Sequence, residues 1–198
     1  MAAPLPATDL APGFAEPVRQ SQQAFRAALN ALSYPGRVVT VPGCVAAPPL
    51  GPAQAALALT LVDFETPVWL DHAAAGAAAW LRFHCGCPIV ETPSAARFAF
   101  VVAPEAMPPL AAFDAGSDEF PDRSATLVLS VRSLSGAGDL RLTGPGIPGE
   151  AGLGAEGLPP DFPAQWQHNR ELFPRGVDLF LTEGDRLAGL PRTVRMRS

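Results

Sequence analysis

Arginine and histidine side chains, together with a glycine-rich turn, are the groups in this sequence that could bind an anion. Arg82 and His84 lie near the expected end of a helix, and arginine suits a phosphate group because it offers two parallel hydrogen bonds. Residues 143–146, Thr-Gly-Pro-Gly, end an expected strand in a loop whose glycines could expose backbone N–H groups to an anion. Both patterns also have plain structural interpretations, which are a satisfied side-chain pair and a tight turn.

Three soft metal ligands, His84, Cys85 and Cys87, lie within four residues. Structural zinc takes four ligands, usually from two separated pairs, and the other two histidines and Cys44 form no second pair. Buried free cysteine often packs as a small hydrophobic residue. We therefore expect no metal site, and a small metal-binding regulatory protein stays as an alternative.

Sequence motifs assign no catalytic residue. Residues 152–157 spell Gly-x-Gly-x-x-Gly, but a dinucleotide site requires a strand before this pattern and a helix that opens within it. Pro148 precedes the pattern and Pro159-Pro160 follow it, so we interpret it as a chance match in a loop. No serine lies in a Gly-x-Ser-x-Gly elbow. Asp178 is one of several carboxylates for which the sequence indicates no partner.

The composition excludes several classes of protein. A formal net charge of −5 argues against non-specific binding to nucleic acid. All 14 basic residues are arginine, so no lysine is available for a Schiff base with pyridoxal phosphate. The N-terminus lacks the pattern of a signal peptide, the apolar stretches are too short to span a bilayer, and three cysteines make no disulfide framework. We expect a cytoplasmic protein that binds no membrane.

The pattern of apolar residues predicts alternating helices and strands in the first half of the chain. A helix is expected over 18–32, with further helices over 53–62, 73–83 and 164–173 and strands over 38–41, 66–70 and 98–102. The first helix has one mainly apolar face, which comprises Val18, Gln22, Phe25, Leu29 and Leu32.

The second half indicates a sheet rich in hairpins. Residues 125–131 predict a buried strand, 134–139 a hairpin turn, and 140–143 the strand that returns from it. Residues 144–163 are interpreted as a long Gly/Pro loop, and strands over 177–181 and 187–190 as a closing hairpin. The expected fold class is α/β, a mixed-sheet single domain over residues 17–198 after a loose segment, 1–16.

The chain resembles the PhnH family, the H subunits of the bacterial carbon–phosphorus lyase system. Short matching stretches are spread over nearly the whole length, and their order and spacing together make the resemblance specific. They are Phe25-Arg26 through Tyr34-Pro35-Gly36, Thr66-Pro67-Val68-Trp69-Leu70, Leu81-Arg82-Phe83-His84, Ser124-Ala125-Thr126-Leu127, Ser133-Leu134-Ser135-Gly136, Leu140-Arg141-Leu142-Thr143-Gly144-Pro145-Gly146-Ile147, Phe173-Pro174-Arg175-Gly176-Val177-Asp178 and Pro191-Arg192-Thr193.

This resemblance implies a fold like that of pyridoxal-phosphate-dependent transferases without the cofactor, and the lack of lysine agrees with it. It also implies a homodimer in a core complex with the G, I and J subunits. That system uses ATP to convert alkylphosphonates into a ribose 5-triphosphate phosphonate and later cleaves the C–P bond. The H subunit is grouped with the first, transferase step, whereas the radical lyase step belongs to the J subunit.

Two functions follow from the resemblance. The first is an accessory subunit that shows no turnover of ATP or phosphonate by itself. The second is a subunit with its own phosphate or nucleotide site, in which Arg82, Arg123 and Arg192 would gather. The full set of candidate anion-binding residues is Arg82, His84, Arg123, Thr143, Gly144, Gly146 and Arg192.

Overall fold

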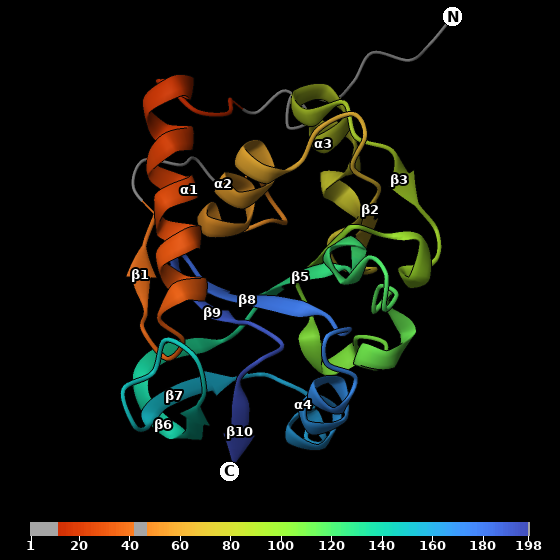
Figure 1. Cartoon of the computed structure of the whole chain (residues 1–198). Coiled ribbons are helices and arrows are strands. Elements are labelled where there is room, and N and C mark those ends of the chain that lie inside the picture. The colour runs from red at the N-terminus through yellow and green to blue at the C-terminus, as the bar shows by residue number, and fades with distance from the viewer. Residues whose placement is uncertain (1–11, 42–46, 198) are drawn as a thin grey trace, which may run out of the picture.

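A seven-stranded sheet forms the middle layer of the molecule (Figure 1). The computed structural model describes residues 12–41 and 47–197. Five strands of this sheet are parallel, and β9 runs antiparallel to both of its neighbours, β8 and β1. In spatial order the strands are β1 (Val39–Thr40), β9 (Arg186–Leu190), β8 (Asp178–Glu183), β5 (Thr126–Ser130), β4 (Phe98–Val101), β2 (Val68–Leu70) and β3 (Ile89–Val90).

Both faces of the central strands are buried, which explains their continuous apolar sequences. Side chains alternate between the faces, as a two-residue period requires. In β5, Val128 belongs to the core on one side, while Leu127 and Leu129 belong to the core on the other side. The predictions of a mixed sheet, of a buried strand at 125–131 and of a closing β8–β9 hairpin are confirmed.

Three helices cover one face of the sheet (Figure 1). They are α1 (Pro17–Ser33), α2 (Pro52–Leu61) and α3 (Ala78–Cys85), and a short 3-10 helix, η2 (Ala75–Ala77), leads into α3. Proline occupies the first turn of α1 and α2, where no N–H is needed. Gly86 ends α3 in the left-handed conformation, at φ 68°.

The helix α1 packs on the molecule through its small residues, not through its large apolar ones. Ala24, Ala28 and Ala31 are buried, whereas Val18, Phe25 and Leu29 are 76%, 51% and 55% exposed. The backbones of α1 and β9 lie so close together that only small side chains fit between them. A Cβ on Gly189 of β9 would lie 2.6 Å from the backbone carbonyl carbon of Ala31. The large apolar side chains Val18, Phe25 and Leu29 therefore face solvent rather than the core.

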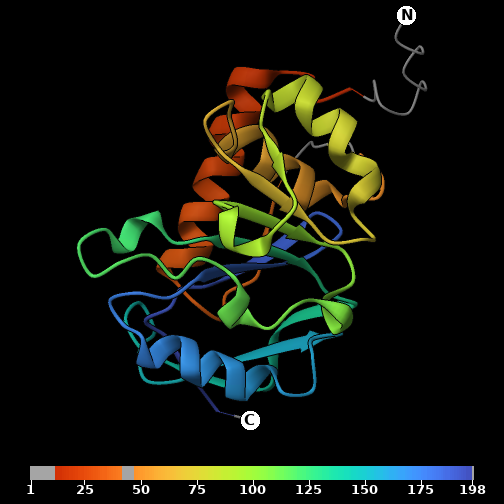
Figure 2. The ribbon, with the colours of Figure 1, turned by 90° about the vertical axis from the view of Figure 1, so that its right-hand side faces the viewer.

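The other face of the central sheet is covered by a second sheet and by α4 (Phe162–Glu171), which lie at the bottom of Figure 1. Figure 2, turned by 90°, shows α4 below the central sheet and α1 above it. The second sheet has the order β10 (Arg195–Arg197), β6 (Ser133–Thr143) and β7 (Ala151–Glu156), and its pairs are antiparallel. Further 3-10 helices are η3 (Pro93–Ala95), η4 (Pro104–Ala106), η5 (Leu110–Ala112) and η6 (Pro121–Arg123).

This second sheet corrects two predictions. Residues 134–139 form no hairpin turn but lie within β6, whose partners are β7 and β10 and not β5. Within the expected loop over 144–163, residues 151–156 form strand β7 and residues 162–163 begin α4. Gly138, one of the two glycines that resembled a turn, allows close approach at a register shift, since a Cβ there would lie 2.3 Å from Cα of Gly154.

The Gly-x-Gly-x-x-Gly pattern lies mainly in β7, an antiparallel strand, and not at a turn from a strand into a helix. This position supports its interpretation as a chance match. No helix in the described part of the chain is long and apolar enough to cross a bilayer. Residues 1–11 of the predicted loose segment lie outside the described residues.

Candidate functional site

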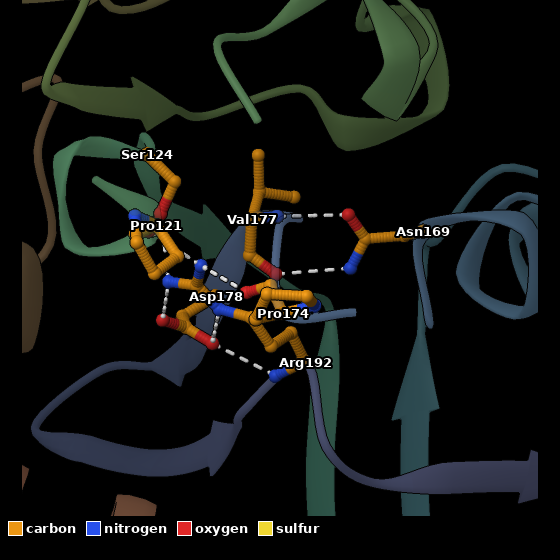
Figure 3. Close-up of polar contacts among 7 residues, drawn as sticks. All are labelled: Pro121, Ser124, Asn169, Pro174, Val177, Asp178 and Arg192. Carbon is orange, nitrogen blue, oxygen red and sulfur yellow. Dashed lines mark hydrogen bonds and ion pairs between the residues drawn. The ribbon is translucent and has the colours of Figure 1, made fainter. Parts of the chain in front are cut away.

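Arg192 lies at the centre of a hydrogen-bond network beside the amino-terminal ends of β5 and β8 (Figure 3). The Asp178 carboxylate accepts hydrogen bonds from Nε–H of Arg192, at 3.1 Å, and from one Nη2–H, at 2.5 Å. The other Nη2 bond reaches Ser124 Oγ at 2.7 Å. Its Nη1 donates to the carbonyl oxygens of Pro121 and Pro174, at 2.7 and 3.3 Å. A guanidinium has five N–H donors, and here each of them has an acceptor.

The β8–β9 hairpin positions this pair. Asp178 begins β8, and Arg192 lies two residues beyond the end of β9, so antiparallel pairing brings the two residues close together. The backbone N–H of Arg192 also donates to Asp178, at 2.8 Å. The side chains of Arg192 and Asp178 are only 13% and 24% exposed. Because no N–H of the Arg192 guanidinium remains unbonded, this geometry favours a structural role over direct contact with a ligand.

The loop from α4 to β8 is fixed by Asn169 (Figure 3). The buried amide of Asn169 donates to the carbonyl oxygen of Val177 at 3.0 Å and accepts its N–H at 2.8 Å. Gly176 adopts a φ of 120°, and a Cβ there would lie 2.9 Å from the Asn169 carbonyl oxygen. These contacts hold Asp178 in place for Arg192.

A pocket of about 520 Å³ lies next to this network, where the ends of β6 and α4 meet the segment between β9 and β10. Arg170 and Arg195 contribute two guanidinium groups, and Glu171 contributes a carboxylate. The remaining lining residues are Thr143, Gly144, Pro145, Phe173, Arg192 and Thr193. The positive charge and the hydroxyl groups of this pocket suit an anion.

The predicted anion-binding residues divide into separate groups. Thr143, Gly144 and Arg192 line the pocket. Gly146 packs instead against the end of α1, where a Cβ would lie 2.0 Å from the carbonyl oxygen of Ser33. Arg123 is exposed, and its guanidinium lies 4.2 Å from the centre of a phenylalanine ring, Phe120.

Arg82 and His84 lie in α3, on the opposite face of the central sheet from α4 (Figure 1). His84 packs near the rings of Trp80 and Phe83, with centroids 4.7 and 4.9 Å away. The three arginines predicted to gather therefore do not share one site. Arg123 lies near the Arg192 network, because Arg192 donates to Pro121 and Ser124, which flank Arg123 in the sequence. Arg82 lies outside this network, in α3.

The cysteines near His84 have the properties of packed thiols. Burial and the neighbouring Cys87 raise the pKa of Cys85 to about 12, and burial also raises the pKa of Cys87. Among the described residues, no three His, Cys, Asp or Glu side chains form a group that could hold a metal ion. Cys44 lies outside the described residues.

The carboxyl ends of the parallel strands are the usual ligand position in open α/β sheets. Here, two buried polar side chains near this edge already have partners. Gln54 donates to the carbonyl oxygens of Val101 and Val128, both at 3.1 Å. Asp71 accepts three backbone N–H groups, at 2.8 to 3.1 Å.

Sequence reasoning placed Arg170, Arg195 and Asn169 in no site, because the contacts that position them join segments that only the fold brings together. It named Asp178 without a partner, and the structure supplies Arg192. One signal was available for Arg170. It lies four residues after Trp166, and residues at that spacing share a helix face.

Comparison with known proteins assigns the chain to a family. Residues 12–197 match the family described as bacterial phosphonate metabolism protein (PhnH). The alpha-D-ribose 1-methylphosphonate 5-triphosphate synthase subunit PhnH of Rhizobium meliloti (strain 1021) is 41% identical over 92% of this chain and 93% of its own length. A candidate C-P lyase subunit protein, HtxG of Stutzerimonas stutzeri, is 37% identical over 89% of this chain and 86% of its own length. The chain therefore belongs to the PhnH family of bacterial phosphonate metabolism proteins.

Proposed function

We propose that this protein is an accessory subunit of the carbon–phosphorus lyase system, in the ATP-dependent step that forms ribose 1-methylphosphonate 5-triphosphate. The observation that carries the proposal is the match to a synthase subunit over nearly the full length of both chains. The second relative, also named as a C-P lyase subunit, agrees with this assignment.

The exposed apolar face of α1 supports a role as a subunit. Val18, Phe25 and Leu29 follow one another at helical spacing and leave large side chains in solvent. Exposed apolar surface of this kind is typical of protein–protein contacts. The proposed partners are a second copy of this chain and the G, I and J subunits of the core complex.

An accessory role also agrees with the chemistry of the described residues. Arg192 and Asp178 are bonded to each other, Gln54 and Asp71 hold backbone groups, and Cys85 is a thiol with a raised pKa. We further propose the fold of pyridoxal-phosphate-dependent transferases without their cofactor. The mixed sheet between helices and the absence of lysine support this part of the proposal.

Co-expression with the G, I and J subunits tests the assignment. The wild-type protein should co-purify with them, and the purified assembly should release adenine from ATP in the presence of methylphosphonate. The protein purified alone should show no such release. Robust turnover by the isolated chain would show that it is an enzyme in its own right.

Surface variants test the role of α1. Phe25→Glu and Leu29→Glu should weaken dimerisation or co-purification without changing the melting temperature, because both side chains are more than half exposed. Phe64→Glu is the matched control, since Phe64 is 72% exposed in the turn between α2 and β2, outside α1 and outside the pocket beside Arg192. If all three variants assemble as the wild type does, α1 is not an interface.

A further inference from the structure

We propose that the pocket beside Arg192 binds the dianionic head of a phosphonate or phosphate, and that Arg170 and Arg195 are the residues that contact it. The inference rests on the proposed function only for the identity of the ligand. The charge and the position of the pocket come from the structure.

The two arginines differ from Arg192 in the groups that they already bind. Every N–H of the Arg192 guanidinium has an acceptor. Nε of Arg170 is buried and has no hydrogen-bond partner among the described residues. The side chain of Arg195 is exposed on β10, and no ion pair joins it to a described carboxylate. The pocket therefore offers guanidinium donors that the fold does not use.

Trp166 brings these two arginines to the same pocket. Its buried ring donates from Nε1 to the carbonyl oxygen of Val194, at 2.9 Å, which joins α4 to the start of β10. Arg170 follows Trp166 by one helical turn, and Arg195 follows Val194 directly. Thr143 is the β6 residue paired with Arg195, and it also lines the pocket.

The charges in the pocket predict the sign of each substitution. Arg170 and Arg195 contribute positive charge without a bonded carboxylate, whereas the charge of Arg192 is largely balanced by Asp178. Glu171 contributes negative charge, and its nearest basic partner is His168, at 3.9 Å. Removing an arginine should therefore weaken anion binding, and removing the Glu171 carboxylate should strengthen it.

Calorimetric titration of the full-length protein at low ionic strength tests the proposal. The probes are methylphosphonate, tripolyphosphate and acetate. Arg170→Gln and Arg195→Gln should each weaken binding of the phosphorus anions by about tenfold, since a charged hydrogen bond of this kind is worth roughly one decade in affinity. Glu171→Gln should tighten it, and Arg19→Gln, which removes an exposed arginine of α1, should leave it unchanged.

The two phosphorus probes distinguish the sources of the ligand. Stronger binding of methylphosphonate assigns the pocket to the phosphonate, and stronger binding of tripolyphosphate assigns it to a triphosphate chain. The proposal is overturned if acetate binds equally well, or if the Arg170→Gln/Arg195→Gln protein binds as tightly as the wild type. Unchanged melting temperatures of the variants are expected, because the fold does not use either guanidinium. Binding by the isolated chain is independent of co-purification, so either proposal can fail alone.

Discussion

Replacing Arg192 with leucine should destabilise the protein, because it removes all five hydrogen bonds of one side chain. The change leaves the Asp178 carboxylate, two carbonyl oxygens and a hydroxyl without this partner. Breaking a fully buried ion pair costs about 3–5 kcal/mol, and an exposed pair is worth less than about 1 kcal/mol. Arg192 and Asp178 are 13% and 24% exposed, so the buried case applies with a discount for water.

We therefore expect a loss of about 3 kcal/mol, toward the lower end of the range for a buried pair. In a protein of this size, that loss lowers the melting temperature by roughly 6–12 °C. Thermal and urea unfolding, followed by circular dichroism, measure the change. Arg192→Lys should recover only part of it, because an ammonium group keeps the charge but cannot bond in five fixed directions.

The matched control is Arg19→Leu, which removes an exposed pair with Glu16 and should cost less than about 0.5 kcal/mol. The double variant Arg192→Leu/Asp178→Leu should lose less than the sum of the two single changes, since the two residues share one network. A difference in melting temperature of about 2 °C corresponds to a loss of roughly 0.5 kcal/mol in a protein of this size. An Arg192→Leu protein that melts within about 2 °C of the wild type would therefore refute a structural role for the network.

Three further predictions concern Asn169, the cysteines near the end of α3 and the lack of lysine. Asn169→Leu should cost about 2–3 kcal/mol, because both backbone groups of Val177 lose their buried partner, and chemical denaturation measures this loss. In a Cys44→Ser background, Cys85 and Cys87 should both react slowly with thiol reagents at neutral pH and faster only on unfolding, because burial raises the pKa of both thiols. Since folding raises the pKa of Cys85 from 9.0 to about 12, stability should fall as the pH rises through this interval. The purified protein should show no aldimine absorption band after incubation with pyridoxal phosphate, because the chain has no lysine.

Local patterns in the sequence were sufficient to predict most strands of the central sheet. The continuous apolar run at 125–131 predicts a strand buried on both faces, and β5 is such a strand. Proline at the first turn of the helices and the alternation of apolar segments gave their positions to within a few residues. The composition alone excludes a lysine-anchored cofactor, since that statement needs no coordinates.

Other features depend on which segments meet in space. The glycines at 136 and 138 predict a turn when only local conformation is considered, but both lie within β6, and Gly138 allows its close contact with β7. The helix α1 buries alanines because its close approach to Gly189 of β9 leaves no room for larger side chains on that face.

In the candidate site, too, the sequence identifies residue types, and the tertiary contacts determine what they bind. The sequence identified Arg192 as a polar residue of interest, yet it carried no information on the five acceptors that occupy its guanidinium. Arg170 and Arg195 look like ordinary surface arginines until α4 packs against the start of β10 through Trp166 and Val194. A residue type specifies which bonds a side chain is able to make, and only the tertiary contacts determine which of those bonds the fold already uses.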